Sequence, residues 1–285
     1  MTQIVSVQSS VSYGFVGNSA ATFALRRMGI DVWPVPTVSL SNHNGYPSVH
    51  GVHLAASQIE DIIAGLDELG VLAHLDALLT GYLPDVATGE VVLRAAQLVA
   101  RRSPGALICC DPVMGERGAG LYCAPQLPDF FGDRLVPLAG LVTPNLFELE
   151  TLTGVVTHSL AEIVDAARRL RARGPSTVLV TSVEGREVPP DVVAMVALGH
   201  DGAWYVETPR QPRSFSGSGD LTTAVFLARM LGGHSLPDSL EFAAASVHGV
   251  LAHTTRTARG ELELVGAQDE LVEPSRQFTV RRLDG

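Results

Sequence analysis

Several short segments of this chain are apolar at nearly every position, and segments with a helical pattern separate them. The segment Ala106–Pro112, for example, is uninterrupted by a polar side chain until it reaches Asp111. A strand with one face in water alternates apolar and polar residues, whereas a strand buried on both faces is apolar throughout. Alternation of such strands with helices is typical of a mostly parallel sheet covered on both faces. We therefore predict an α/β fold of three αβα layers.

Glycine, proline and polar loops set the bounds of the expected elements. Gly29 stops the first helix after Met28, as glycine commonly does. Pro34 and Pro36 divide the next extended stretch into two strands. The expected strands are 3–10, 31–35, 37–40, 77–83, 106–112, 141–145 and 177–181, followed by a hairpin of 192–198 and 203–208, and the expected helices are 19–28, 59–69, 89–101, 146–152, 160–173, 221–231 and 236–254.

Length and composition agree with one continuous core. The chain has 285 residues, of which 46% are hydrophobic, and such a chain can bury one large core or two small ones. We find neither a linker-like break nor an internal repeat. We therefore predict a single domain over residues 1–285.

Polar residues stand where the expected strands end. In a parallel sheet with helices on both faces, ligands bind beyond the carboxyl ends of the strands. Because these ends meet at one edge, the side chains there are expected to form one continuous site. The residues are Ser9, Asn42 to Asn44, Tyr82, Asp111, Asn145 with Glu148, Thr181 with Ser182, and Asp220.

The segment Gly217-Ser218-Gly219-Asp220 precedes an apolar helical run. A Gly-x-Gly turn that opens a helix brings free backbone N–H groups and the positive end of the helix dipole to one point. That point suits a phosphate. Asp220 has a second interpretation, because an aspartate in the first turn also caps a helix.

Two further acids stand at neighbouring strand ends. Asp111 ends a buried strand, where its carboxylate needs a cation or a hydrogen-bond donor. Asn145 begins a helix, with Glu148 one turn later, and this spacing also fits an N-cap with a capping-box acid. The two roles can coexist. Asp111 and Glu148 could hold Mg²⁺ directly or through water, since Mg²⁺ takes few carboxylates and keeps several waters.

The glycine-rich segment Gly115–Gly120 has two interpretations, a surface loop or a lid that contacts phosphate. Cys123 follows it and could reach an aldehyde substrate as a thiolate, although an ordinary thiol pKa of about 8.5 leaves little thiolate at neutral pH. Arg210 and Arg213 precede the Gly-x-Gly segment and could approach a nucleotide, or could be solvated.

The composition excludes several classes of function. The chain contains no lysine, so it has neither a Walker-type phosphate loop nor a Schiff-base lysine. A formal charge of −10 without a basic face argues against a nucleic-acid partner. No apolar run approaches about 18 residues, and no signal-peptide pattern opens the chain. Three cysteines without metal-ligand spacing agree with a reducing cytoplasm.

Seven features, in this order, resemble the pyridoxal kinases of the ribokinase-like superfamily, and they cover nearly the whole chain. The Gly-x-Gly-Asp element occurs across the superfamily, whereas the Ser-Asn-His and Gly-Asn-Ser-Ala segments are more specific. The features are Gln8-Ser9 with Gly14 and Gly17-Asn18-Ser19-Ala20; Ser41-Asn42-His43; Gly81-Tyr82-Leu83; Asp111 to Gly115; Thr143-Pro144-Asn145 with Glu148; Val180-Thr181-Ser182; and Gly217 to Asp220.

The resemblance implies transfer of the γ-phosphoryl group of ATP to the 5′-hydroxymethyl group of pyridoxal. Asp220 would be the general base, and the amides of Gly217, Ser218 and Gly219 would form the anion hole. Mg²⁺, K⁺ and a homodimer are implied as well. The implied nucleotide and metal side holds Asp111, Glu116, Tyr122, Thr143, Asn145, Glu148, Thr181 and Ser182, and the implied pyridine side holds Ser9, Val16, Leu40, His43, Asn44, Gly45 and Tyr82.

Three residues depart from the commoner family pattern. Asn44 stands where many members have threonine, Thr181 where several have a basic residue, and Ser218 where threonine is commoner. None of these changes removes the base or the anion hole. Two alternatives remain: a hydroxymethylpyrimidine or broad-specificity vitamin kinase of the same fold, and a vitamin-binding protein without catalysis.

Overall fold

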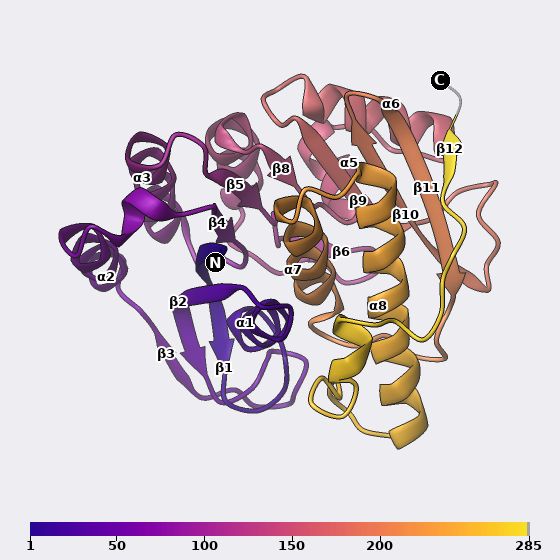
Figure 1. Ribbon diagram of the computed structural model, residues 1–285, viewed down its shortest axis with the longest axis horizontal. Coiled ribbons are helices and arrows are strands. Elements are labelled where there is room, and N and C mark those ends of the chain that lie inside the picture. The colour runs from indigo at the N-terminus through magenta and orange to yellow at the C-terminus, as the bar shows by residue number, and fades with distance from the viewer. Residues whose placement is uncertain (284–285) are drawn as a thin grey trace.

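The computed structural model describes residues 1–283, and within them ten strands form one twisted sheet (Figure 1). Its order is β12-β11-β10-β9-β8-β5-β4-β1-β2-β3. The strands are β1 (Gln3–Val11), β2 (Asp31–Leu40), β3 (Gly51–His53), β4 (Ala77–Thr80), β5 (Leu107–Cys110), β8 (Leu141–Val142), β9 (Thr177–Val183), β10 (Val192–Gly199), β11 (Gly202–Pro209) and β12 (Arg281–Leu283), and a separate pair is β6 (Gly115–Glu116) with β7 (Gly120–Leu121).

Helices connect most of the parallel strands, as the sequence pattern predicts. No helix among the described residues is long and apolar enough to cross a bilayer. The helices are α1 (Asn18–Arg27), α2 (Ala56–Glu68), α3 (Val86–Arg102), α4 (Leu127–Phe130), α5 (Leu146–Thr153), α6 (Leu160–Arg171), α7 (Ser218–Leu231) and α8 (Leu236–Thr257), with short turns η1 (Val71–His74), η2 (Phe131–Leu135), η3 (Val136–Leu138) and η4 (Gln268–Leu271).

The six central strands, from β9 through β2, pair in parallel. The hairpin of β10 and β11 extends the sheet antiparallel to β9. The predicted hairpin is therefore confirmed, and the sheet is mostly parallel as expected.

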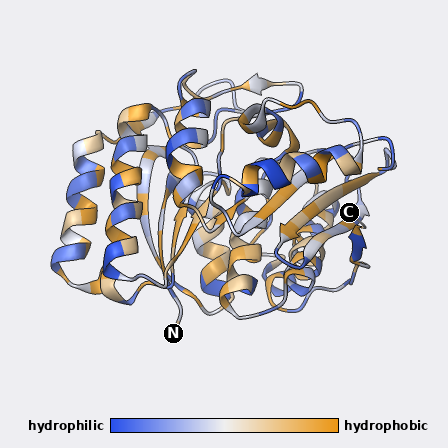
Figure 2. Cartoon of the chain, turned by 90° about the horizontal axis from the view of Figure 1, so that it is seen from above, coloured by the Kyte–Doolittle hydropathy of each residue, from blue (hydrophilic) through white to orange (hydrophobic). Residues whose placement is uncertain are grey.

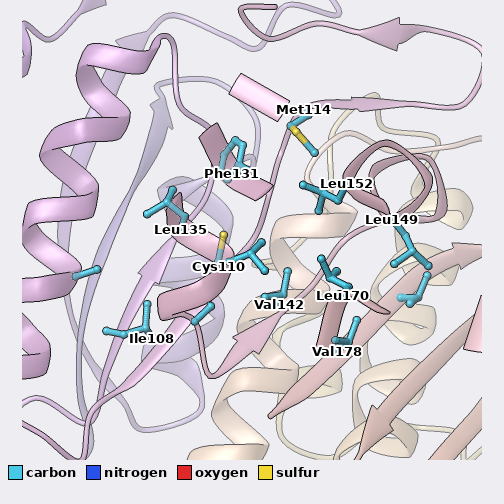
Figure 3. Close-up of a cluster of buried hydrophobic side chains, with 14 of the residues drawn as sticks. Ile108, Cys110, Met114, Phe131, Leu135, Val142, Leu149, Leu152, Leu170 and Val178 are labelled. Atoms are coloured by element: carbon cyan, nitrogen blue, oxygen red, sulfur yellow. The ribbon is translucent and has the colours of Figure 1, made fainter. Parts of the chain in front are cut away.

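Neighbouring residues of one strand face two different helical layers. On β5, Cys110 packs with α2 to α6 in one apolar cluster, while Cys109 packs with α1, α7 and α8 in the other. Figure 3 shows part of the first cluster, where Val142 and Val178 of the sheet lie beside Leu170 of α6. The strands are largely hydrophobic, and the helices carry both kinds of residue (Figure 2). The three-layer prediction is thus confirmed.

The division of residues 31–40 into two strands is wrong, because β2 continues through both prolines. The N–H of Asp31 donates to the carbonyl of Thr2 on the β1 side. Amide groups alternate sides along a strand, so the nitrogens of Pro34 and Pro36 face away from β1. β3 pairs only with Val38–Leu40, and the prolines therefore lie on an open edge, where a missing N–H breaks no ladder bond.

Smaller differences occur at the ends of elements. The sequence pattern did not predict the short edge strands β3 and β12, which carry few apolar residues. Helix α7 begins at Ser218 rather than Leu221, so Gly217 is its N-cap and Ser218 to Asp220 form its first turn. The glycine-rich segment after β5 folds as the β6–β7 hairpin.

Candidate functional site

The site lies at the edge where the parallel strands end. Asp111 follows β5, Thr143 follows β8 and Thr181 lies near the end of β9, and these three strands are neighbours in the sheet. An additional parallel bridge joins Asn145 to Thr181. Helix α7 approaches the same edge from one layer, and the hairpin β6–β7 follows β5 there (Figure 1).

The first turn of α7 is held against the loop that follows β1. Gly217 is the N-cap and has φ 85°, a left-handed conformation that glycine adopts without strain. A Cβ atom at Gly217 would overlap the carbonyl oxygen of Phe15. At Gly219, by contrast, a Cβ would meet nothing within 4 Å. The N–H of Ser218 donates to the carbonyl of Phe215 at 3.4 Å, whereas the N–H groups of Gly217 and Gly219 have no acceptor within the helix.

Asp220 is the third residue of α7 and is half-buried. Burial raises the pKa of its carboxyl group to about 6, and hydrogen bonds from the N–H groups of Gly17 and of Asp220 itself oppose that rise. A carboxyl group with this pKa is ionised at neutral pH and still accepts a proton readily. The N–H of Gly17 is a contact that sequence reasoning missed, although Gly17 stands in a quoted motif.

Asp111 is 5% exposed and receives a hydrogen bond of 3.0 Å from the Thr223 hydroxyl. The Thr143 and Thr223 hydroxyl oxygens are 2.9 Å apart. Burial, then the negative charges of Glu148 and Asp220, raise the pKa of Asp111 well above its usual value. Thr223 was missed from the sequence, yet its position three residues after Asp220 places it on the same helical face.

The Glu148 carboxylate accepts hydrogen bonds from the backbone that follows β5. Its Oε1 accepts the N–H of Met114 at 2.8 Å and that of Gly115 at 3.4 Å, and its Oε2 accepts the N–H of Asn145 at 2.9 Å. The Asn145 side chain in turn accepts the N–H of Glu148 at 2.9 Å and donates to the carbonyl of Gly115 at 2.8 Å. The capping box is thus present.

Glu148 is almost fully buried, and burial raises the pKa of its carboxyl group to about 7 against the three N–H donors. Asp111 and Glu148 therefore form an acidic pair that attracts positive charge. Among residues 1–283, no group of three or more His, Cys, Asp or Glu side chains is arranged to hold a metal ion. A cation at this pair would complete its coordination with water or substrate oxygens.

The hairpin β6–β7 stands over the acidic pair. The N–H of Tyr122 donates to the carbonyl of Met114 at 2.9 Å. Tyr122 is 42% exposed, and partial burial together with the negative charges of Glu148, Asp220 and Asp111 raises the pKa of its hydroxyl. Glu116 is exposed at the hairpin. Burial also raises the pKa of Cys123, which disfavours the thiolate that the sequence left open.

The expected nucleotide side is formed by the end of β9. Ser182 has φ 52°, an uncommon conformation for a residue other than glycine and one that often marks a site. The two expected arginines are engaged elsewhere on the surface. Arg210 lies 3.7 Å from Glu184, and Arg213 stacks over the Phe215 ring at 4.5 Å.

The expected pyridine side combines the end of β1 with the segments that follow β1, β2 and β4. A Cβ atom at Gly17 would overlap the Ser9 backbone and hydroxyl oxygens, so these two segments are in direct contact. Val16, Leu40, His43 and Tyr82 are half-buried, Ser9 is buried, and Asn44 and Gly45 are exposed. Sequence reasoning missed Glu261, whose carboxylate reaches His43 from the far end of the chain.

Known proteins resemble this chain along its length. A family model described as phosphomethylpyrimidine kinase matches residues 35–264. A pyridoxal kinase of Rubrobacter xylanophilus is 47% identical over 281 residues, covering 98% of this chain and 97% of that protein. One from Leifsonia xyli is 43% identical and covers 99% of both. The structure of the Leishmania donovani pyridoxal kinase with ADP and ginkgotoxin has a TM-score of 0.93, at 28% identity, and covers 100% of both chains.

Proposed function

This chain belongs to the pyridoxal kinases of the phosphomethylpyrimidine kinase family, and we propose that Asp220 is the base of its phosphoryl transfer. The fold is ribokinase-like, and the chain is an ATP-dependent pyridoxal kinase. The reaction moves the γ-phosphoryl group of ATP to the 5′-hydroxymethyl group of pyridoxal and gives pyridoxal 5′-phosphate and ADP.

One observation carries the assignment of the base. Asp220 is half-buried in the first turn of α7, its pKa is raised to about 6, and the N–H groups of Ser218 and Gly219 precede it in the same turn. A base and an anion-binding turn are thus adjacent. Phosphoryl transfer needs positioning, charge neutralisation and one proton acceptor rather than a covalent nucleophile.

The proposed step follows from this arrangement. The Asp220 carboxylate accepts the proton of the 5′-hydroxyl group, and the hydroxyl oxygen forms a bond to the γ-phosphorus. The bond between that phosphorus and the bridging oxygen breaks, and ADP leaves. The N–H groups of Gly217 to Gly219 and the positive end of the α7 dipole stabilise the negative charge on the equatorial oxygens.

The acidic pair fits a magnesium ion. Asp111 is buried, its pKa is raised, and the Thr223 hydroxyl donates a hydrogen bond to it. Both Glu148 oxygens already accept backbone N–H groups. We infer that Asp111 would be the direct ligand and that Glu148 would act through water. Bound Mg²⁺ would neutralise phosphate charge, which the chain cannot do with lysine.

The remaining proposed site residues bind either the nucleotide or the pyridine ring. We propose that Tyr122, Thr143, Asn145, Thr181 and Ser182 lie along the nucleotide. On the pyridine side we propose Ser9, Val16, Leu40, His43, Asn44, Gly45 and Tyr82. Glu116 remains a proposed nucleotide contact through the hairpin. Arg210 and Arg213 would have to leave their present partners to reach ATP.

A second candidate substrate is hydroxymethylpyrimidine, because the matching family model carries the description phosphomethylpyrimidine kinase. The curated relatives at 47% and 43% identity are pyridoxal kinases, and these favour pyridoxal. Steady-state phosphorylation of pyridoxal, pyridoxine, pyridoxamine and hydroxymethylpyrimidine with MgATP decides between them. A clear preference for the pyrimidine contradicts the assignment.

The base is tested by the variant Asp220→Asn. We expect kcat to fall by at least about 10²-fold, the lower range for a lost general base, while pyridoxal binding measured by calorimetry persists. Asp238→Asn is the matched control, because Asp238 occupies the same third position in α8 and is exposed. Equal turnover of wild type and Asp220→Asn would contradict the proposal. Negligible turnover of both, with pyridoxal still bound, would instead indicate a binding protein without catalysis.

Family membership also supports three properties of the whole protein. We propose a homodimer, a cytoplasmic location and activation by K⁺. Sedimentation equilibrium measures the first, and the substrate panel with and without K⁺ measures the third. No residue of this chain is assigned to K⁺.

A further inference from the structure

The Glu261 carboxylate links the C-terminal part of the chain to the loop at the pyridine side. Its Oε1 lies 2.5 Å from the Tyr46 hydroxyl and 3.0 Å from Nε2 of His43. The side chains of His43 and Glu261 are 14% and 11% exposed. More than two hundred residues separate these partners in the sequence, so the contact forms only in the folded protein.

Both partners of Glu261 act as donors. The N–H of Gly45 donates to Nδ1 of His43 at 3.1 Å, so Nδ1 carries no proton and Nε2 donates to Glu261. The Tyr46 hydroxyl donates as well, and its hydrogen bond to Glu261 is the largest cause that raises the pKa of Tyr46 to about 12. The centroids of the His43 and Tyr46 rings are 5.0 Å apart. One carboxylate oxygen therefore fixes two neighbouring side chains of one loop.

The other carboxylate oxygen of Glu261 has no hydrogen-bond partner within residues 1–283, although it is buried. It faces Gly14, where an added Cβ atom would overlap it. A buried oxygen without a partner is unfavourable for folding.

The segment that carries Glu261 is firmly anchored. Leu262 and Leu264 are buried in the cluster with α1, α7 and α8. The N–H of Glu263 donates to the Thr254 hydroxyl of α8 at 3.0 Å. The carbonyl of Arg259 accepts a hydrogen bond from Arg213, which stands four residues before Gly217. The segment 259–264 thus contacts both the approach to the anion-binding turn and the loop at the pyridine side.

We propose that Glu261 is a positioning residue for pyridoxal: it holds the loop 41–47 in place through His43 and Tyr46, so that the loop is already ordered when the substrate binds. This inference rests on the proposed assignment of that loop to the pyridine side. Glu261 itself does not touch the reacting atoms. A loop that is already ordered loses less conformational entropy when the substrate binds. Glu261 is therefore expected to affect the affinity for pyridoxal rather than the rate of the chemical step.

The test compares Glu261→Gln with Glu263→Gln. Glu263 lies two residues away on the same segment and pairs with Arg259 at 3.0 Å instead of with the loop. For Glu261→Gln we expect the KM for pyridoxal to rise about tenfold, the effect of weakening hydrogen bonds to a charged group. The kcat and the KM for ATP should stay within about twofold of wild type. Glu263→Gln should leave all three unchanged.

Tyr46→Phe provides an independent test, because it removes the hydroxyl group that donates to Glu261 and leaves Glu261 itself in place. We expect a smaller rise in the KM for pyridoxal, and the double variant with Glu261→Gln should show less than the sum of the two free-energy effects. If Glu261→Gln does not fold, the single variant Tyr46→Phe decides the question, and an unchanged KM for pyridoxal in that variant overturns the inference.

Three outcomes overturn the inference: an unchanged KM for pyridoxal, equal rises in the KM for pyridoxal and for ATP, or additive effects in the double variant. The assignment of pyridoxal as substrate fails separately, if the wild type itself does not phosphorylate it. A fall in kcat together with a lowered melting temperature would also overturn the inference, because it would indicate a structural role only.

Discussion

Glu148 has an observed structural role, and the role that we propose for it beside a metal ion would use the same carboxylate. The sequence spacing from Asn145 left a helix cap and a metal-side acid as alternatives. The structure contains the complete capping box, and the same carboxylate also accepts two N–H groups from the chain after β5. These bonds fix the backbone that carries the hairpin β6–β7. The cap therefore holds the geometry on which the proposed metal position depends.

Asp111 should make the protein less stable when no cation is present. Its raised pKa means that the folded state holds the proton more tightly than the unfolded state. The resulting stability is present below the unfolded pKa and is lost as pH rises through the folded pKa. At pH 8 without divalent cations, Asp111→Asn should therefore be more stable than wild type, because the variant lacks the buried carboxyl group that lowers stability when it ionises.

Urea unfolding at pH 4 and pH 8 measures this effect, and the advantage of Asp111→Asn should shrink at the lower pH. Addition of MgCl₂ at pH 8 should stabilise wild type more than the variant, because the variant lacks the carboxylate. A variant that is less stable than wild type at pH 8 without Mg²⁺ would contradict the prediction. So would an equal response of both proteins to Mg²⁺.

At the scale of elements, the sequence predicted what depends on local pattern. The apolar runs predicted the parallel strands, and the polar residues at their ends predicted the edge at which we propose the site. The course of β2 through Pro34 and Pro36 depends on which strand lies beside it, which no local pattern contains. Glu261 is a similar case, because nothing in its neighbourhood marks a residue that pairs across the fold with His43.

The two glycines at the start of α7 differ in backbone conformation and in the space around them. Gly217 has φ 85°, and a Cβ there would overlap the Phe15 backbone. Gly217→Ala should therefore cost at least about 2 kcal/mol of stability, from left-handed strain and the clash together, and should abolish turnover. Gly219 has no heavy atom within 4 Å of an added Cβ, so Gly219→Ala should keep the melting temperature of wild type.

Gly219→Ala should still lower kcat by about 10²-fold, because its methyl group points into the space proposed for the phosphoryl group and a misplacement of about 1 Å has that effect. Thermal melting and steady-state kinetics of both variants measure the contrast. Wild-type turnover in Gly219→Ala would show that the open space beside the turn does not receive the phosphate. A stable Gly217→Ala would show that the loop after β1 can move away.

At the scale of the molecule, the site draws on both ends of the chain. β1 lies inside the sheet between β4 and β2, while α7 and the Glu261 segment come from the last quarter of the sequence. The N–H of Gly17 reaches Asp220 across this separation. No contiguous portion of the chain contains the whole site, so the site should form only when the sheet and both helical layers are complete.

Two adjacent leucines on β4 test whether the layers unfold together. Leu78 is fully buried in the cluster with α2 to α6, and Leu79 is 1% exposed in the cluster with α1, α7 and α8. Leu78→Ala and Leu79→Ala should each cost about 2–5 kcal/mol, the range for leucine truncation in a core. Because the two residues share one strand, loss of either layer exposes the other face of the same sheet. Calorimetry of both variants should therefore show one transition, shifted to lower temperature in each. Two transitions, with each variant lowering a different one, would show that residues 1–285 form more than one folding unit.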